Sequence, residues 1–312
     1  MNDPQKYVVA IGVSCIDEYY SLPQWPQEGN QSRVEFVEAV VGGMIPNAAC
    51  VLAGYGVKTY LIDQMSSGSP VTRQILEDLQ SYRLDVSCVR FIDGLPDVKC
   101  MIFLTPGERT LLAVDGQKPA LALDEDQLEL LRGAAYVYTT TYDFMKIPDF
   151  HALADSLKQH GVKLVFDVEG ASFTEEESML LKKANLLLFN QFGFEGYCAG
   201  RAAPLVLEEL FDSGVETAVV TLGKEGCRCH TRTEEIRVNG VQVAVVDPTG
   251  AGDTFNSSFL RCMLEDWPVR KALAFATAAA AYAVTRHGPK GGVNTVAAVE
   301  RLMREYGTTS IQ

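Results

Sequence analysis

The segment at residues 247–255 reads Asp-Pro-Thr-Gly-Ala-Gly-Asp-Thr-Phe and combines a turn of small residues with a carboxylate. A β-type run at residues 243–246 leads into it, and an apolar helical pattern follows it. Gly250, Ala251 and Gly252 leave their backbone N–H groups accessible. A helix start adds unpaired N–H donors and the positive end of the helix dipole. The segment therefore predicts a binding site for an anion such as a phosphate.

Asp253 directly follows this turn and is expected in the first turn of the helix. A carboxylate beside a bound anion is unfavourable unless it acts on a neighbouring group, so we interpret Asp253 as a general base that takes a proton from a hydroxyl. The alternative is that Asp253 caps the helix and the glycines only form a tight turn. Two other nucleotide-binding patterns fail: the third glycine of a dinucleotide turn would fall at Phe255, and Gly223-Lys224 lacks the first glycine of a phosphate-binding loop.

Apolar strands and helical-period segments alternate along most of the chain. This alternation is typical of an α/β fold, a three-layer αβα sandwich in which helices cover both faces of a central, mostly parallel sheet. Strands are expected at residues 7–13, 58–62, 135–138, 163–166, 186–189 and 217–221. Helices are expected at residues 46–55, 69–82, 149–160, 205–213, 250–265, 268–286 and 295–306.

Two stretches, residues 17–41 and 96–115, interrupt this alternation with β-rich patterns and no helix between their strands. The second is split by a turn at residues 105–108. We expect the two stretches to form a small β layer beside the main sheet that covers the site as a lid. Because no linker or internal repeat is evident, residues 1–312 are expected to form a single domain.

Three segments match one enzyme family in order and spacing. The turn at residues 247–255 is similar to the family's C-terminal signature, and Gly42-Gly-Met-Ile-Pro-Asn47-Ala is similar to its N-terminal Gly-Gly-x-x-x-Asn-x-Ala element. Thr221-Leu-Gly-Lys-Glu-Gly resembles the segment that lines its nucleotide. The chain thus resembles the ribokinase-like (PfkB) carbohydrate kinases over nearly its whole length. The resemblance implies a ribokinase-like fold and ATP-dependent transfer of a phosphoryl group to a hydroxyl of a sugar or sugar-like molecule.

The resemblance also implies roles for matching positions. Asp253 would be the catalytic base, and the backbone of residues 250–252 would form the anion hole for the transferred phosphoryl group. Arg109, in the turn of the second β stretch, either reaches the substrate from the lid or is simply solvated. The positions implied on the sugar side are Asp17, Gly42, Gly43 and Asn47.

On the nucleotide side, the resemblance implies that Asn190 lies near the phosphates and Mg²⁺, as the first residue of the family's Asn-x-x-Glu element. The sequence departs from that element, because Gly193 stands where the Glu is expected and the nearest acid is Glu195. Either Glu195 replaces the missing Mg²⁺ carboxylate, or water and the nucleotide phosphates suffice. The remaining nucleotide-side positions are Thr221, Gly223 and Lys224.

Asp247 and Thr249 match positions that help to build a monovalent-cation site in related kinases, so activation by K⁺ is an expectation, although a plain turn explains the same residues. Asp167 follows the strand expected at residues 163–166, where α/β proteins place ligand groups; the alternative is a loop cap. Cys227 and Cys229 alternate along a strand, which favours core packing over a zinc site.

Two alternative functions stay open. One is a nucleoside kinase of the same superfamily, which would need an aromatic or apolar base pocket. The other is a non-catalytic regulator that binds sugar or nucleotide on the same fold, an idea motivated by the departure at Gly193. The intact Asp253 and its glycines favour an enzyme over such a regulator.

Composition limits the partners and the compartment. A formal charge of −13 argues against a nucleic-acid partner. The N-terminal stretch lacks the pattern of a secretion signal, and the most apolar stretch, residues 272–284, is short and suits a buried helix better than a membrane span. Eight scattered cysteines suit reduced thiols in the cytoplasm. Exposed lid strands would also allow a homodimer to form.

Overall fold

The computed structural model describes residues 6–106, 108–114 and 118–306, without the side chains of Glu108 and Arg109. An eight-stranded sheet crosses the molecule in the order β14-β13-β12-β11-β10-β9-β1-β4. Its strands are parallel from β4 to β12, and β13 and β14 are antiparallel at one edge. The strands are β1 Tyr7–Ile11, β4 Lys58–Ile62, β9 Tyr136–Thr140, β10 Lys163–Val168, β11 Leu186–Asn190, β12 Thr217–Thr221, β13 Gly226–Thr231 and β14 Glu235–Asn239.

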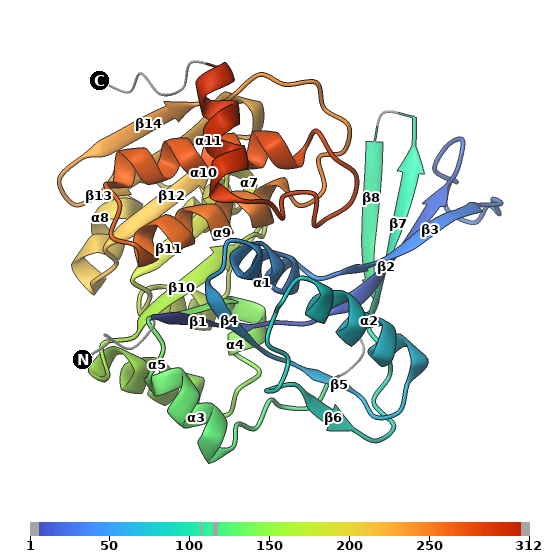
Figure 1. Cartoon of the computed structure of the whole chain (residues 1–312), viewed down its shortest axis with the longest axis horizontal. Coiled ribbons are helices and arrows are strands. Elements are labelled where there is room, and N and C mark those ends of the chain that lie inside the picture. The colour runs from blue at the N-terminus through green and yellow to red at the C-terminus, as the bar shows by residue number, and fades with distance from the viewer. Residues whose placement is uncertain (1–5, 107, 115–117, 307–312) are drawn as a thin grey trace.

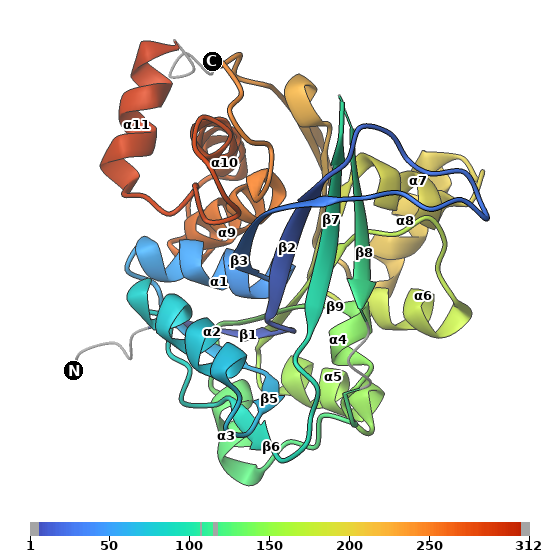
Figure 2. The ribbon, with the colours of Figure 1, turned by 90° about the vertical axis from the view of Figure 1, so that its right-hand side faces the viewer.

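Helices cover both faces of this sheet, as Figures 1 and 2 show. In β1, Val8 and Ala10 face one apolar core while Val9 and Ile11 face the other, so the strand is buried on both sides. The first core packs against α1 Met44–Gly54, α2 Pro70–Ser81, α9 Ala251–Leu264, α10 Val269–Ala283 and α11 Val296–Glu305. The second packs against α3 Glu125–Arg132, α4 Thr141–Phe144, α5 Phe150–Gln159, α6 Glu175–Leu181, α7 Gln191–Cys198 and α8 Ala203–Ser213. The expected three-layer α/β fold is confirmed.

A separate four-stranded sheet stands beside the main one and faces the viewer in Figure 2. Its order is β3-β2-β7-β8. Its strands are β2 Cys15–Ser21, β3 Glu35–Gly42, β7 Lys99–Thr105 and β8 Glu108–Val114. These strands arise from the two stretches that the sequence singled out. A short parallel pair, β5 Gln64–Ser66 and β6 Arg90–Ile92, was not expected from the sequence.

The β-type run at residues 243–246 does not form a strand. Residues 243–246, which lead into the glycine-rich turn, join no sheet within the described chain. Val245 and Val246 are 62% and 51% exposed, and the Val246 amide donates to the Val284 carbonyl at 2.7 Å. Residues 243–246 therefore belong to the loop that connects β14 to α9, although their composition is typical of a strand.

The alanine-rich helix α10 is buried in the first core, as expected for residues 272–283. Cys227 and Cys229 on β13 are also fully buried, which confirms core packing for both thiols. Throughout the described residues, no helix has both the length and the apolar character that a bilayer crossing requires.

Candidate active site

Asp253 and Asn47 meet at the first turns of α9 and α1. Asn47 Nδ2 donates to Asp253 Oδ2 at 3.2 Å across 206 residues of sequence. The two helices are further tied by Ser257, whose single hydroxyl hydrogen is shared between the Ala48 carbonyl at 2.8 Å and the Asp253 carbonyl at 2.6 Å. The N-terminal and C-terminal motifs therefore belong to one site.

The glycine-rich turn at the start of α9 is tightly packed at Gly250 and accessible at Gly252. Gly250 has a φ of 76°, and a Cβ there would lie 2.0 Å from the Pro289 carbonyl oxygen, so only glycine fits. The Ala251 amide donates to the Pro248 carbonyl at 3.3 Å. Gly252 is exposed, and a Cβ on it would meet no atom within 4 Å. The turn is thus open at Gly252, beside Asp253.

Asp167 is buried at the end of β10, and two side chains hold it. The Tyr138 hydroxyl donates to Asp167 Oδ2 at 2.5 Å, and Asn256 Nδ2 donates to the same oxygen at 2.8 Å. Asn256 follows Asp253 by one helical turn, so both residues face the same end of the sheet. The contact with Asn256 holds Asp167 against α9, close to Asp253.

Burial and like charges make the carboxylates of this site more basic than usual. Burial, followed by the charge of Glu169, raises the pKa of Asp167 to about 7. Burial also raises the pKa of Asp253 well above its usual value; the neighbouring Asp167 adds to this rise, and the hydrogen bond from Asn47 partly opposes it. A raised pKa makes an ionised carboxylate a stronger base, which is the property that proton removal from a hydroxyl needs.

Asp17 on β2 lies against Gly42 at the end of β3. A Cβ on Gly42 would lie 2.0 Å from Asp17 Oδ2, so the glycine allows the carboxylate to approach the backbone closely. Gly43 begins α1 with a φ of 113°, and a Cβ there would lie 2.4 Å from the Val13 carbonyl oxygen. Both glycines of the N-terminal motif are thus required by local geometry.

Two buried polar atoms near these glycines lack a hydrogen-bond partner among the described residues: Asn47 Oδ1 and Ser14 Oγ. Buried polar atoms are normally hydrogen-bonded. Ser14 and Asn47 belong to the segments that carry Asp17 and Gly43, so these atoms are suited to meet the hydroxyls of a bound ligand.

The sequence reasoning missed a buried ion pair beside Ser14. Asp63 directly follows β4; its two carboxylate oxygens accept from the Ser14 amide at 2.8 Å and from Lys118 Nζ at 2.6 Å. The sequence did contain a signal for Asp63, because it is an acidic residue directly after a buried parallel strand, where α/β proteins place ligand groups. The same signal drew attention to Asp167. The sequence reasoning also missed Lys290, which is buried and donates to the Val41 carbonyl at 2.5 Å, just before Gly42.

Two residues expected on the nucleotide side, Asn190 and Thr221, are paired neighbours at the ends of β11 and β12. Asn190 Oδ1 accepts from the Gly193 amide at 2.6 Å and so caps α7. A Cβ on Gly193 would lie 2.3 Å from the Val168 carbonyl oxygen. A glutamate therefore cannot occupy position 193 unless this backbone moves.

The remaining expected residues surround this edge or lie away from it. Gly223 and Lys224 form an exposed single turn after β12, with Gly223 at a φ of 56°. Glu195 accepts from Gln191 Nε2 at 2.9 Å and lines a groove of about 750 Å³ on the α7 and α8 side of the sheet. Arg109 pairs with Leu104 in the small sheet, and its side chain lies outside the described residues.

Asp247 ties two loops together. Its Oδ1 accepts from the Thr249 amide at 2.8 Å, and its Oδ2 accepts from the Gly288 amide at 2.9 Å. Burial alone would raise the pKa of Asp247, but the two amide hydrogen bonds outweigh it and lower the pKa below its usual value. Asp247 therefore fixes the loop at residues 286–292 beside the glycine-rich turn.

Comparison with known proteins decides the family. Residues 5–295 match the family described as pfkB family carbohydrate kinase. The chain belongs to this family. The resemblance inferred from the motifs and the assignment as a carbohydrate kinase are thereby confirmed.

Relatives of this pfkB-family kinase match it over almost its full length. A 5-dehydro-2-deoxygluconokinase of Geobacillus kaustophilus is 24% identical, with 96% of this chain and 93% of the relative covered. The Arabidopsis thaliana ribokinase solved with ribose and ATP shares 24% identity and superposes with a TM-score of 0.83, covering 96% of this chain and 99% of the other. A putative Escherichia coli ribokinase II solved with ATP and Mg²⁺ shares 17% identity, with a TM-score of 0.80 and coverage of 96% and 99%.

Proposed function

We propose that this kinase transfers the γ-phosphoryl group of ATP to a hydroxyl of a sugar or sugar acid, with Asp253 as the general base. The contact between Asn47 and Asp253 carries the proposal, because it joins the motif expected on the sugar side to the turn expected on the phosphate side. Asp253, the residue in this contact that would act as the base, has a raised pKa. Its neighbour Gly252 leaves the turn open, since a Cβ there would meet no atom within 4 Å.

In this scheme Asp17, Ser14 Oγ and Asn47 Oδ1 bind acceptor hydroxyls, and Asp253 removes the proton of the hydroxyl that attacks. The loss of that proton makes the oxygen nucleophilic, and the turn at residues 250–252 stabilises the charge on the phosphoryl group in flight. The small sheet would act as a lid that keeps water from the acceptor, with Arg109 on its β8 strand.

The fold relatives solved with ATP and Mg²⁺ support the same cofactors here. The charge of Glu169 raises the pKa of Asp167, and the charges of Asp167 and Glu169 both raise the pKa of Asp253, so negative charge gathers where a divalent cation would neutralise it. Bound Mg²⁺ supplies neutralisation of phosphate charge. We propose that waters and phosphates provide most of its ligands, that Asn190 and Glu169 lie nearest to it, and that Glu195, on its separate groove, is the weaker candidate.

The nucleotide itself would extend along the ends of β11 and β12. Asn190 and Thr221 are paired there, and the turn with Gly223 and Lys224 follows. Lys224 is exposed and would neutralise a phosphate of the nucleotide. This assignment leaves the acceptor on the other side of Asp253, as in-line transfer requires.

We also propose that the protein forms a homodimer through the small sheet in the cytoplasm. Several large apolar side chains on that sheet are exposed, with Phe36 at 60% and Leu111 at 55%. All eight cysteines are free thiols, which suits a reducing compartment. Light scattering of the wild type and of Leu111→Lys tests the dimer; a monomeric wild type contradicts it.

Formation of ADP with a panel of aldoses, ketoses, sugar acids and nucleosides tests the function. We expect turnover with at least one sugar or sugar acid. Turnover with nucleosides alone would replace this proposal by a nucleoside kinase. Binding of sugar and ATP without any turnover would replace it by a non-catalytic regulator.

A further inference from the structure

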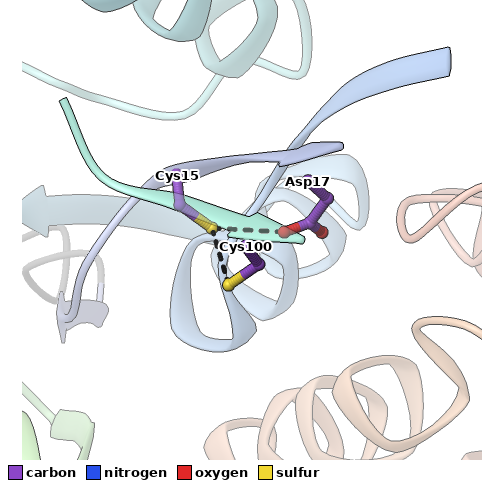
Figure 3. Close-up of side chains that lie close together, drawn as sticks. All are labelled: Cys15, Asp17 and Cys100. Carbon is purple, nitrogen blue, oxygen red and sulfur yellow. Dashed lines mark hydrogen bonds between the residues drawn. The ribbon is translucent and has the colours of Figure 1, made fainter. Parts of the chain in front are cut away.

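Two strands of the small sheet bring two thiols and a carboxylate together. Cys15 and Asp17 lie two residues apart on β2 and share one face of the strand, and Cys100 on β7 lies opposite Asp17. The Cys15 thiol donates to Asp17 Oδ1 at 3.3 Å, and the two sulfur atoms lie 4.0 Å apart (Figure 3). Cys15 and Asp17 are only 4% and 8% exposed, while Cys100 is partly exposed.

The spacing of these atoms fits a tetrahedral metal ion. Two thiolates bound to Zn²⁺ at about 2.3 Å lie about 3.8 Å apart, and a bound thiolate and carboxylate oxygen lie about 3.6 Å apart. The observed separations are 4.0 Å between the sulfur atoms and 3.3 Å from sulfur to oxygen, and all three ligand atoms lie within 4.8 Å of one another. Small side-chain rotations would complete the geometry.

A disulfide between the same cysteines fits less well. The strand register places Cys100 opposite Asp17, so Cys15 is offset from Cys100 by two residues along the strand. That offset and the spacing between strands separate the two α carbons by about 8 Å. A disulfide requires α carbons closer than about 7 Å, so the strands would have to slide. A metal ion bridges the thiols with the backbone in place.

We propose that Cys15, Cys100 and Asp17 bind a thiophilic divalent cation such as Zn²⁺, with water as the fourth ligand. A set of three protein ligands and one open position is a known arrangement for zinc. Each thiol releases its proton to solvent when it binds the metal.

Metal binding would also act on the acceptor, a consequence that rests on the role proposed for Asp17 above. Asp17 Oδ1 accepts from Cys15, whereas Oδ2 is the oxygen that lies against Gly42. A cation on Oδ1 withdraws charge from the carboxylate and weakens the hydrogen bonds that Asp17 accepts from sugar hydroxyls. Zn²⁺ is therefore expected to raise the KM for the acceptor, and a chelator is expected to reverse the effect.

Zinc retention tests the site itself. The full-length protein is kept reduced, stripped with a chelator, equilibrated with Zn²⁺, dialysed and assayed for metal. We expect the wild type to retain about one equivalent more than Cys15→Ser or Cys100→Ser. Cys88→Ser, at another partly exposed cysteine, is the matched control and should behave as the wild type. Equal retention by the wild type and Cys100→Ser overturns the site, and this partly exposed position keeps the test valid if Cys15→Ser does not fold.

Acceptor kinetics test the consequence. With a sugar that is phosphorylated, Zn²⁺ should raise the acceptor KM of the wild type about tenfold and leave that of Cys100→Ser unchanged, because weakening one charged hydrogen bond costs about 1.5 kcal/mol or more. An unchanged KM in zinc-loaded wild type overturns the coupling through Asp17 while the zinc site stands. Absence of any phosphorylated acceptor would instead contradict the proposed function, and zinc retention would still decide the site.

Discussion

Replacing Asp167 by Asn isolates the effect of one buried charge on stability. Tyr138 and Asn256 both donate to the same carboxylate oxygen, Oδ2. The amide oxygen of an asparagine can accept both hydrogen bonds, so Asp167→Asn removes the charge and leaves the network in place. The variant should therefore fold, and its stability should differ from that of the wild type in a pH-dependent way.

The size of this difference follows from the pKa of Asp167, which burial and then the Glu169 charge raise from 3.8 to about 7. A raised pKa in the folded state means that stability is greatest below the unfolded pKa and falls as the pH rises toward 7. The full difference corresponds to about 4 kcal/mol. About 2 kcal/mol of it falls between about pH 5.5 and about pH 8.5. Asp167→Asn lacks this loss, so it should gain about 2 kcal/mol over the wild type across that interval.

Urea unfolding at both pH values measures the difference in unfolding free energy. The surface control is Asp212→Asn, which removes an exposed ion pair with Arg232 and should change stability by less than about 1 kcal/mol at either pH. A stability difference between Asp167→Asn and the wild type that is the same at both pH values would refute the assignment of a buried, high-pKa carboxyl to this position.

Three further predictions concern catalysis. Asn47→Ala removes a hydrogen bond that lowers the pKa of Asp253. Turnover should therefore fall about 10-fold to 100-fold, and the acid limb of the pH profile of kcat/KM should move to higher pH. An acid limb that moves to lower pH would contradict this prediction. Gly42→Ala places a Cβ 2.0 Å from Asp17 Oδ2, so the KM for the acceptor should rise about tenfold or more with the KM for ATP unchanged, and equal changes in both would count against it. Replacing K⁺ by a large organic cation should reduce initial rates if Asp247 and Thr249 help to hold a monovalent cation, and unchanged rates would remove that expectation.

The sequence predicted the layers well because burial on both faces of a parallel sheet leaves a clear apolar signature. The strand at residues 58–62 matches β4, and the helix at residues 69–82 includes all of α2. The run at residues 243–246 shows the limit of this reasoning. Its valines look like a strand, but strand formation also needs a neighbouring edge, which local composition does not reveal.

The residues of the candidate site could be predicted from the sequence where they lie together in one short motif. Asp253 and its glycines form such a segment, and so do Gly42, Gly43 and Asn47. Asn256 could not be singled out, since an asparagine inside a helix has no distinctive pattern until its partner Asp167 is known. The pairing of Cys15 with Cys100 depends on the register of two strands far apart in sequence, which neither strand specifies alone.

The central claim is that the carboxylate at the mouth of α9 removes the proton of the attacking hydroxyl. Comparing the wild type with Asp253→Asn in single-turnover phosphorylation and in ATP binding tests it most directly. We predict that the variant loses about 10³-fold or more in turnover while its affinity for ATP stays within about threefold. Turnover within about tenfold of the wild type would show that another group accepts the proton, and the assignment of Asp253 as the base would then be wrong.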